Sequence, residues 1–131
     1  MRVWFLKETP SIDGLTASGD NTARVWDVDN GRLVLELTGH QDTVGSTTYS
    51  PDGRHIITAS WDNTVRVWEA NSGRQAAVLK GHGASVMSAT YSPDGSRIVT
   101  ASADKTARVW EANSWLLVAE YKGHRARINS A

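Results

Sequence analysis

A repeat of 42 residues is the feature that most constrains how this chain of 131 residues can fold. Gly-His occurs at residues 39–40, 81–82 and 123–124, and Arg-Val-Trp recurs with the same spacing. The segments 39–80 and 81–122 are identical at about 25 of their 42 positions, far more than chance allows for a repeat of this length. Tandem repeats of this size are single supersecondary units that stack on their neighbours, so three such units are expected here.

Within each period the hydrophobic pattern is that of strands. In the middle unit, short runs rich in β-branched or aromatic residues occur at 44–49, 56–60, 65–69 and 75–79. Ser-Pro-Asp-Gly at 50–53 favours a tight turn, because proline fixes φ and glycine accepts positive φ. Short connections join antiparallel neighbours, so each period is expected to form a four-stranded antiparallel sheet. Two amphipathic helices per period are excluded, since turn residues interrupt every segment of sufficient length.

A unit with Gly-His early and a Trp-acid pair late resembles a repeat of the WD-repeat β-propeller family. The late pairs are Trp26-Asp27, Trp68-Glu69 and Trp110-Glu111, so two units carry glutamate where the family name expects aspartate. The resemblance implies an all-β fold with three four-stranded antiparallel blades in a single propeller segment, residues 1–131. Blade 1 is expected at about 1–38, blade 2 at about 39–80 and blade 3 at about 81–122, followed by a terminal stub at 123–131.

The resemblance also implies a hydrogen-bonded tetrad of histidine, serine, aspartate and tryptophan in each blade. Aspartate would accept from one imidazole nitrogen, and serine would bridge the other nitrogen to the indole N–H. The expected members are His40, Ser60, Asp62 and Trp68 in blade 2; His82, Ser102, Asp104 and Trp110 in blade 3; and Ser18, Asp20 and Trp26 in blade 1. Blade 1 has no histidine of its own.

The same residue types could form a metal site or a catalytic triad. Histidines spaced 42 residues apart belong to separate blades, so they should not converge on one metal ion. A hydroxyl that binds tryptophan inside a sheet is not exposed to a substrate. We therefore expect the tetrads to be structural, with no catalytic residue, no metal and no cofactor.

Three blades are fewer than closed propellers contain, which have roughly four to eight. We expect head-to-tail association into a closed ring, with a dimer of six blades favoured over a trimer of nine. His124 of one subunit would then complete the tetrad of Ser18, Asp20 and Trp26 in another. The alternative is a structural or decayed fragment of a longer WD-repeat protein, without independent partner binding, and the sequence leaves both open.

Propellers of the family that the chain resembles serve mainly as non-enzymatic platforms for protein or peptide partners, which bind loops on one face. The corresponding loops differ most between the repeats. Trp61 is the strongest contact candidate, because its counterparts are Gly19 and Ala103 and tryptophan is frequent in binding hot spots. Packing on a neighbouring loop is the alternative role for Trp61. The other candidate contacts are Gln41, Asp42, Lys105, Arg125 and Arg127.

Three positions depart from the repeat. Trp115 replaces Gly73 at the turn before the last strand, and the turn is strained if it requires positive φ. His55 has no counterpart and is expected at the solvated surface. In the first unit, where Val3 aligns with Val44, a regular turn is missing.

The composition excludes several classes of protein. The chain has no cysteine, so disulfides and thiolate chemistry are absent. With 14 basic and 14 acidic residues it lacks the charge of a nucleic-acid binder. No apolar stretch approaches the roughly 18 residues of a membrane span, and the apolar run 3–6 is too short for a signal peptide. We expect no membrane partner and a cytoplasmic location.

Overall fold

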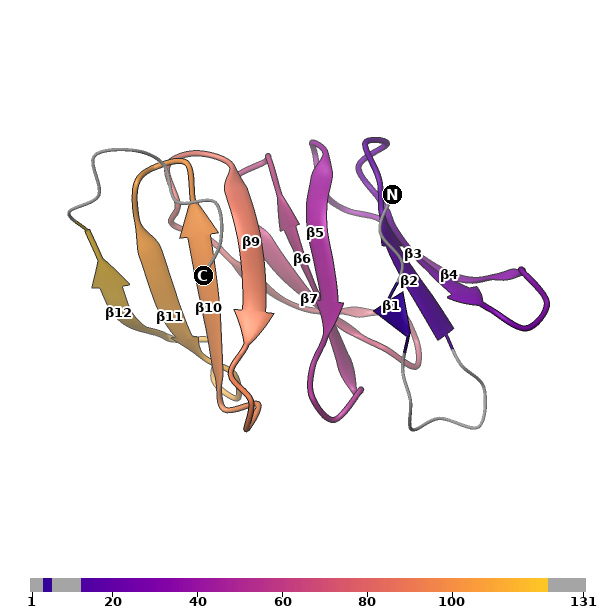
Figure 1. Cartoon of the computed structure of the whole chain (residues 1–131). Helices are drawn as coiled ribbons and strands as arrows, with labels where there is room; N and C mark the ends of the chain where they lie inside the picture. Colours follow the sequence, from indigo (N-terminus) through magenta and orange to yellow (C-terminus); the bar gives the residue numbers. More distant parts are fainter. Residues whose placement is uncertain (1–3, 6–12, 123–131) are drawn as a thin grey trace.

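The computed structural model describes residues 4–5 and 13–122, and this part of the chain folds into strands and turns without a helix. Its strands form three separate four-stranded antiparallel sheets. Figure 1 shows the sheets side by side in chain order, with strands β5 and β9 next to each other near the centre. The predicted fold of three four-stranded antiparallel blades is therefore confirmed, and one chain forms no closed ring. The predicted stub at 123–131 lies outside the described residues.

Consecutive strands pair with one another in every blade. Blade 1 consists of β1 (Trp4–Phe5), β2 (Asp13–Ala17), β3 (Ala23–Asp27) and β4 (Leu33–Leu37). Blade 2 consists of β5 (Val44–Tyr49), β6 (His55–Ser60), β7 (Val65–Glu69) and β8 (Gln75–Leu79). Blade 3 consists of β9 (Val86–Tyr91), β10 (Arg97–Ser102), β11 (Ala107–Glu111) and β12 (Leu117–Tyr121).

The turn between β5 and β6 has the chemistry that its sequence predicts. Gly53 adopts a φ of 73°, and its amide donates to the carbonyl oxygen of Ser50 at 2.9 Å. The Ser50 hydroxyl donates to Asp52 Oδ1 at 2.6 Å. Gly95 repeats this conformation in blade 3 with a φ of 75°. Both turns thus hold an inner strand against its neighbour at the same end of the blade.

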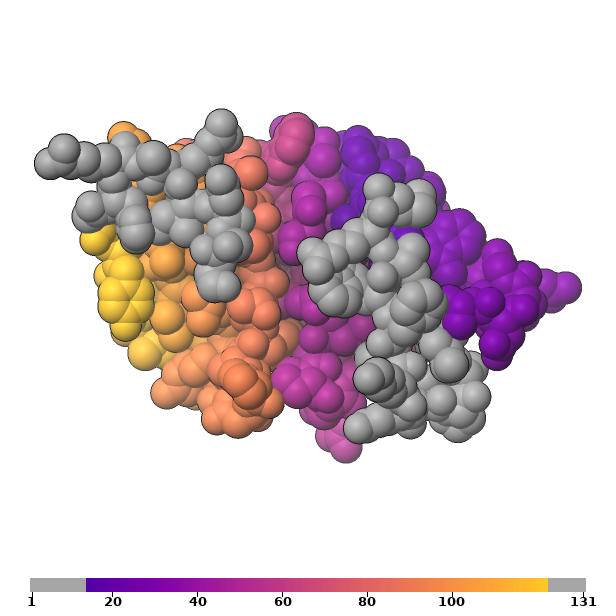
Figure 2. All heavy atoms as spheres, in the orientation of Figure 1, coloured from indigo at the N-terminus to yellow at the C-terminus, as the bar shows by residue number. Residues whose placement is uncertain are grey.

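Blade 2 is buried on both faces because adjacent residues of a strand point to opposite sides of the sheet. Ile56 packs in a cluster with Leu15 and Val25 of blade 1, whereas Ile57 packs in a cluster with Ile98 and Trp110 of blade 3. Both isoleucines are 0% exposed. Burial of each such side chain contributes about 1.5 to 3 kcal/mol, so the central blade is held by both neighbours. In Figure 2 the atoms of blades 2 and 3 abut along the visible face.

Strand β1 differs from the alignment made on sequence alone. Trp4 pairs with Leu15, whose counterpart Ile57 pairs with Thr48. Trp4 therefore takes the position of Thr48, three residues beyond the Gly45 position that the alignment of Val3 with Val44 gave it. The reason is that residues 6–12 connect β1 to β2, a connection two residues longer than 50–54 in blade 2.

Candidate functional site

A chain of hydrogen bonds crosses blade 2 from its tryptophan to its aspartate. Trp68 Nε1 donates to Thr58 Oγ1 at 2.9 Å, and the Thr58 hydroxyl lies 2.6 Å from His40 Nε2. His40 Nδ1 lies 2.8 Å from Asp62 Oδ2. Since an ionised carboxylate can only accept, the bond to Asp62 requires a proton on His40 Nδ1, and the unprotonated Nε2 of the neutral imidazole accepts from the Thr58 hydroxyl. The network therefore assigns the imidazole proton to Nδ1, where it is donated to the carboxylate.

Blade 3 repeats the same arrangement at counterpart positions. Trp110 Nε1 donates to Thr100 Oγ1 at 3.1 Å, and Thr100 Oγ1 lies 2.8 Å from His82 Nε2. His82 Nδ1 lies 2.8 Å from Asp104 Oδ2. Two copies of one geometry show that the network is a property of the repeat, and the predicted association of histidine with aspartate is present in both.

The predicted role of the serines is wrong. Threonine bridges imidazole and indole, whereas Ser60 Oγ donates to the Thr43 carbonyl oxygen at 2.9 Å and accepts from the Asp62 amide at 3.1 Å. The strand register gives the reason: Trp68 pairs with Ile56, so Thr58 is its diagonal neighbour on the same face, within reach of a long side chain. Ser60 lies a further two residues along β6.

Ser102 and Ser18 share this different role. Ser102 Oγ donates to the Ser85 carbonyl oxygen at 3.0 Å, and its oxygen accepts from the Asp104 amide. Ser18 Oγ accepts from the Asp20 amide at 3.2 Å. The signal for the correct residue was in the sequence, since Thr16, Thr58 and Thr100 also recur every 42 residues on the same strand face.

The surroundings fix the charge of the network. Burial alone would raise the pKa of Asp62, but hydrogen bonds from Thr64, the Gln41 amide and His40 lower it to about 2. Burial lowers the pKa of His40 below its ordinary value, although the hydrogen bond to Asp62 opposes this shift. An ionised carboxylate thus faces a neutral imidazole, as the proton assignment requires. The pKa values of Asp104 and His82 are lowered for the same reasons.

Blade 1 has the tryptophan–threonine bond of the network, but its aspartate has a different partner. Trp26 Nε1 donates to Thr16 Oγ1 at 3.0 Å, as in the other blades. Asp20 Oδ2, however, forms an ion pair with Arg24 at 2.7 Å. The Asp20 side chain is 46% exposed, against 8% for Asp62. The predicted fourth member, His124, lies outside the described residues, so its place in a tetrad stays a prediction.

The networks offer no metal site or substrate-binding triad. In the described ranges 4–5 and 13–122, no group of three histidine, cysteine, aspartate or glutamate side chains is placed to hold a metal ion. The hydroxyls of Thr58 and Thr100 belong to residues that are 0% exposed. The part of the chain that the structure describes also contains no helix capable of crossing a membrane. What the networks do is hold the loops that carry the aspartates.

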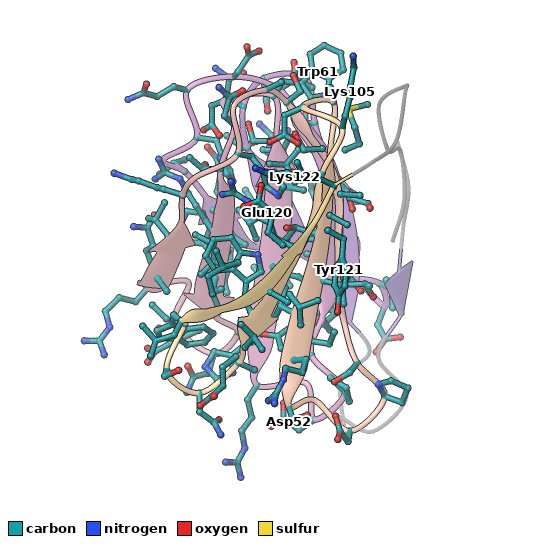
Figure 3. All side chains as sticks on the ribbon, turned by 90° about the vertical axis from the view of Figure 1, so that its left-hand side faces the viewer. Asp52, Trp61, Lys105, Glu120, Tyr121 and Lys122 are labelled. Atoms are coloured by element: carbon teal, nitrogen blue, oxygen red, sulfur yellow. The ribbon has the colours of Figure 1, made fainter. Side chains whose placement is uncertain are left out.

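Those loops place Trp61 at one end of the blades. Figure 3 shows Trp61 and Lys105 at the end opposite to Asp52. Trp61 is 48% exposed, and its backbone amide donates to the Thr43 carbonyl oxygen at 2.9 Å. Gln41 and Asp42 are exposed in the adjoining loop. Arg125 and Arg127 lie outside the described residues.

The indole of Trp61 packs on the inner strand of its own blade. A Cβ placed on Gly45 would lie 3.2 Å from Trp61 Nε1, so the ring covers the glycine closely. Blade 3 has the opposite pair, with Met87 on the strand and Ala103 in the loop. Trp61 therefore combines the two roles that the sequence left open, because the Nε1 edge of its ring lies against Gly45 and about half of the residue is exposed.

Lys105 occupies the next loop in an unusual backbone conformation. Its φ is 72°, close to the values of 74° and 75° at its counterparts Asn21 and Asn63. Asparagine tolerates this region, whereas lysine adopts it at a cost of about 1 kcal/mol. The Lys105 side chain is exposed and forms no ion pair with any described residue. Lys105 therefore places a positive charge at the same end of the blades as Trp61 (Figure 3).

The opposite end of the blades contains the predicted strained turn. Trp115 has a φ of 64°, where Gly31 and Gly73 have 73° and 74°. Its ring lies edge-on to His55 with centroids 6.1 Å apart. His55 is half-buried, so the expectation that it is simply solvated is wrong. The contact joins blade 2 to blade 3, since each residue belongs to a different blade.

The sequence of the chain matches a known protein family over two segments. Residues 31–69 and 73–111 match the family described as "WD domain, G-beta repeat". The two matches cover more than half of the chain. The chain belongs to the WD-repeat family.

Several WD-repeat proteins are similar to parts of the chain. Ribosome assembly protein 4 of Chaetomium thermophilum is 49% identical over 41 residues, covering 31% of this chain and 8% of that protein. Autophagy-related protein 16 of Arabidopsis thaliana is 44% identical over 50 residues, 36% of this chain and 10% of that protein. Coronin-7 of Mus musculus is 37% identical over 57 residues, 42% of this chain and 6% of that protein. The chain thus spans a tenth or less of these relatives' lengths.

Proposed function

We propose that this WD-repeat chain is a non-enzymatic platform that binds a protein or peptide partner at the Trp61 end of its blades. WD repeats generally mediate protein–protein interactions, which supports the class of function. The observation that carries the proposal is the exposed half of Trp61, at a loop position where Gly19 and Ala103 show that the fold needs no aromatic ring. Lys105 supplies a positive charge at the same end of the blades. A cytoplasmic location stays a prediction.

The rigid loops beneath Trp61 favour binding. The residue after Trp61 is Asp62, whose carboxylate is held by His40 and Thr64. The residue before it, Ser60, is bonded to the preceding loop at Thr43. Because the loop is already ordered, a partner that stacks on the indole loses little of its binding free energy to ordering this side of the interface.

The binding proposal can be tested by selecting peptides from a displayed random library on the wild-type chain. The affinity of a selected peptide should fall at least about ten-fold in the Trp61→Ala chain, since exposed tryptophans at hot spots contribute strongly. A Trp115→Gly chain is the matched control, because it removes a tryptophan from the opposite end and restores the glycine of blades 1 and 2. Equal affinity for the Trp61→Ala and wild-type chains would contradict the proposal.

We further propose that two chains associate head to tail, with three chains as the less favoured arrangement. The support is the outer face of blade 3, whose Val99, Val109 and Tyr121 stand where Ile57, Val67 and Leu79 of blade 2 bind the next blade. Tyr121 is 59% exposed and Leu79 is 2% exposed. Figure 3 looks onto this face of blade 3, with Tyr121 labelled. Covering it with a further blade removes apolar surface from water.

Light scattering across a dilution series tests the association. A mass of twice 14.3 kDa that persists on dilution is expected, and three times this mass would indicate the nine-bladed arrangement. A folded monomer at all concentrations would contradict head-to-tail association. It would leave the proposed role of Trp61 intact, because that surface lies within one chain.

A further inference from the structure

Two turns of the same sequence meet between blades 2 and 3. They are Ser-Pro-Asp-Gly at 50–53 and at 92–95, which follow β5 and β9 and lie side by side in Figure 1. A Cβ placed on Gly95 would lie 3.7 Å from Pro51 Cδ, so the two turns are in contact. Together they line a pocket of about 340 Å³, which we call the turn pocket. Its lining side chains include Asp52, His55, Tyr91, Asp94 and Asn113.

Each turn contributes a carboxylate with one free oxygen. Asp52 Oδ1 accepts from the Ser50 hydroxyl at 2.6 Å and from the backbone amide two residues later at 3.0 Å. Asp94 Oδ1 accepts from the Ser92 hydroxyl at 2.7 Å and from the amide and the hydroxyl of Ser96 at 3.0 and 2.8 Å. The Oδ2 atoms of both aspartates form no hydrogen bond or ion pair with any described residue. The turns therefore fix both carboxylates and leave one oxygen of each for a ligand.

The turn pocket is negatively charged. Hydrogen bonds from two neighbouring serines lower the pKa of Asp94 to about 2, and the hydrogen bond from Ser50 lowers the pKa of Asp52. No lysine or arginine is among the described residues that line the pocket, and Arg54 acts on Asp52 from outside this lining. The two ionised carboxylates thus give the pocket a net negative charge whether or not His55 is protonated. A cationic ligand would neutralise this charge.

A residue with a buried, unpaired hydroxyl also lines the pocket. Tyr91 Oη is inaccessible to solvent and forms no hydrogen bond with any described residue. Burial and the negative charge of Asp52 raise the pKa of Tyr91 to about 12, so the hydroxyl is neutral and lies close to that carboxylate. Buried polar atoms almost always have a partner, so this oxygen is a place for a donor from a ligand. Because Tyr91 is only half-buried and side chains commonly adjust on binding, its hydroxyl can turn toward that donor.

The size and chemistry of the pocket favour an arginine side chain over a metal ion. In the described ranges 4–5 and 13–122, no group of three histidine, cysteine, aspartate or glutamate side chains is placed to hold a metal. A volume of about 340 Å³ is in the range of pockets that hold small organic groups. A guanidinium presents a planar fork of N–H donors to several acceptors at once, and it is less strongly hydrated than an ammonium. Pro51 and Ala112 supply apolar surface for its methylene groups.

We propose that the turn pocket binds an arginine side chain of a protein partner. The guanidinium donates to Asp52 Oδ2 and Asp94 Oδ2, which have no described partner, and to the hydroxyl oxygen of Tyr91. Figure 3 shows Asp52 at the end of the blades opposite to Trp61. The turn pocket is therefore a second site, and it does not depend on the peptide-binding surface proposed at Trp61.

Titration of the ¹⁵N-labelled chain with N-acetyl-arginine amide tests the site. The backbone amide signals of residues 50–53 and 92–95 should shift in a saturable way. N-acetyl-citrulline amide, a neutral analogue of the same shape, should bind at least about ten-fold more weakly, because it lacks the charge that strengthens the hydrogen bonds. N-acetyl-lysine amide should also bind more weakly, and calcium chloride at equal ionic strength should not reproduce the shifts.

Three variants and a matched control locate the binding. Asp52→Asn and Asp94→Asn each remove one negative charge and keep the Oδ1 atom that the turn requires. Each should weaken binding of the arginine probe at least about ten-fold, and Tyr91→Phe should weaken it by a smaller factor of about three. Asp29→Asn is the control, because it removes the same charge from an exposed turn of blade 1 and places there the residue type that blades 2 and 3 have.

Each contrary result would overturn the inference for a different reason. Equal binding of the citrulline probe would show that charge is not recognised, and equal binding of the lysine probe would contradict the assignment to arginine. The same shifts with calcium would indicate a metal site. Binding that survives both asparagine variants, or shifts centred on Trp61, would place the ligand outside the turn pocket. The selected peptides and the Trp61→Ala chain test the other end of the blades separately.

Discussion

Blades 1 and 2 place the same aspartate and tryptophan in different surroundings. In blade 2, His40 lies between Asp62 and Thr58, and the aspartate side chain is 8% exposed. In blade 1 there is no described histidine, and Asp20 turns to Arg24 with 46% of its side chain exposed. The tryptophan–threonine bond is the same in both. Histidine is therefore what converts an exposed turn aspartate into part of a buried network.

The difference extends to packing. Blade 2 has neighbours on both faces, whereas among the described residues blade 1 packs against another blade on one face alone. Trp68 is 2% exposed, and its counterpart Trp26 is half-buried. Blade 1 should consequently be the less stable blade of an isolated chain, and the following predictions probe that difference.

The largest effect is expected from removing the tryptophans. Trp68→Ala should lower the free energy of unfolding by about 3 to 5 kcal/mol, because it leaves a cavity in a two-sided core. Trp26→Ala should cost less than half as much, since part of its ring already contacts solvent. Urea denaturation at a concentration where the chain is monomeric gives both values. Equal costs would show that the two blades are packed alike.

A smaller effect is expected from the bridging hydroxyls. Thr58→Val keeps the shape but leaves both Trp68 Nε1 and His40 Nε2 without a partner, which should cost about 2 to 5 kcal/mol. Thr16→Val leaves only Trp26 Nε1 without a hydrogen-bond partner, so it should lower the free energy of unfolding by about 1 kcal/mol. The same denaturation measurements compare them. If Ser60→Ala cost more than Thr58→Val, the assignment of threonine as the bridge would be contradicted.

Acid should destabilise the histidine-containing blades. The pKa values of His40 and His82 are lowered below 6.5, so the unfolded chain binds protons that the folded chain excludes, and stability falls as the pH drops below about 6.5. The pKa of Asp62 is about 2 against an ordinary 3.8, which adds a further loss as the pH falls from about 4 toward 2. Urea midpoints should stay level from pH 8 to about 7 and decrease between about pH 6.5 and 5. A midpoint that rises on acidification is incompatible with neutral buried histidines.

The smallest effect concerns the turn at Trp115. Trp115→Ala loses the contact with His55 and keeps a non-glycine residue at a φ of 64°, whereas Trp115→Gly loses the contact and relieves the strain. The glycine variant should therefore be more stable than the alanine variant by about 1 kcal/mol. Thermal unfolding of the two chains, side by side, checks the sign. An alanine variant of equal or greater stability would mean that the turn carries no strain.

Much of the fold could be predicted because the same pattern of strand and turn residues occurs in each of the three repeats. Strand periodicity and the Ser-Pro-Asp-Gly turns predicted the four-stranded blades, whereas the histidine and tryptophan of each network were implied by the resemblance to WD repeats. The register across strands was harder to predict. Thr58 and Ser60 lie on the same face of β6, and only the pairing of Trp68 with Ile56 decides which hydroxyl reaches the indole.

The surface was the least predictable part. The sequence showed that Trp61 has no aromatic counterpart, but its half-packed position depends on the space above Gly45, which the fold creates. His55 looked solvated because its partner, Trp115, lies 60 residues away in another blade. The position of β1 was not predicted because the sequence between β1 and β2 lacks the Ser-Pro-Asp-Gly run that precedes β6 in blade 2.

Exchange of the tryptophan indole protons tests the central claim that histidine orders a blade. In a His124→Ala chain labelled with ¹⁵N at tryptophan, so that no second copy can supply the imidazole, the indole N–H groups of Trp68 and Trp110 should exchange with solvent about ten-fold more slowly than that of Trp26. The reason is that all three donate to threonine, but only Thr58 and Thr100 are fixed by a histidine. Equal exchange of the three protons, or slowest exchange at Trp26, would contradict the account.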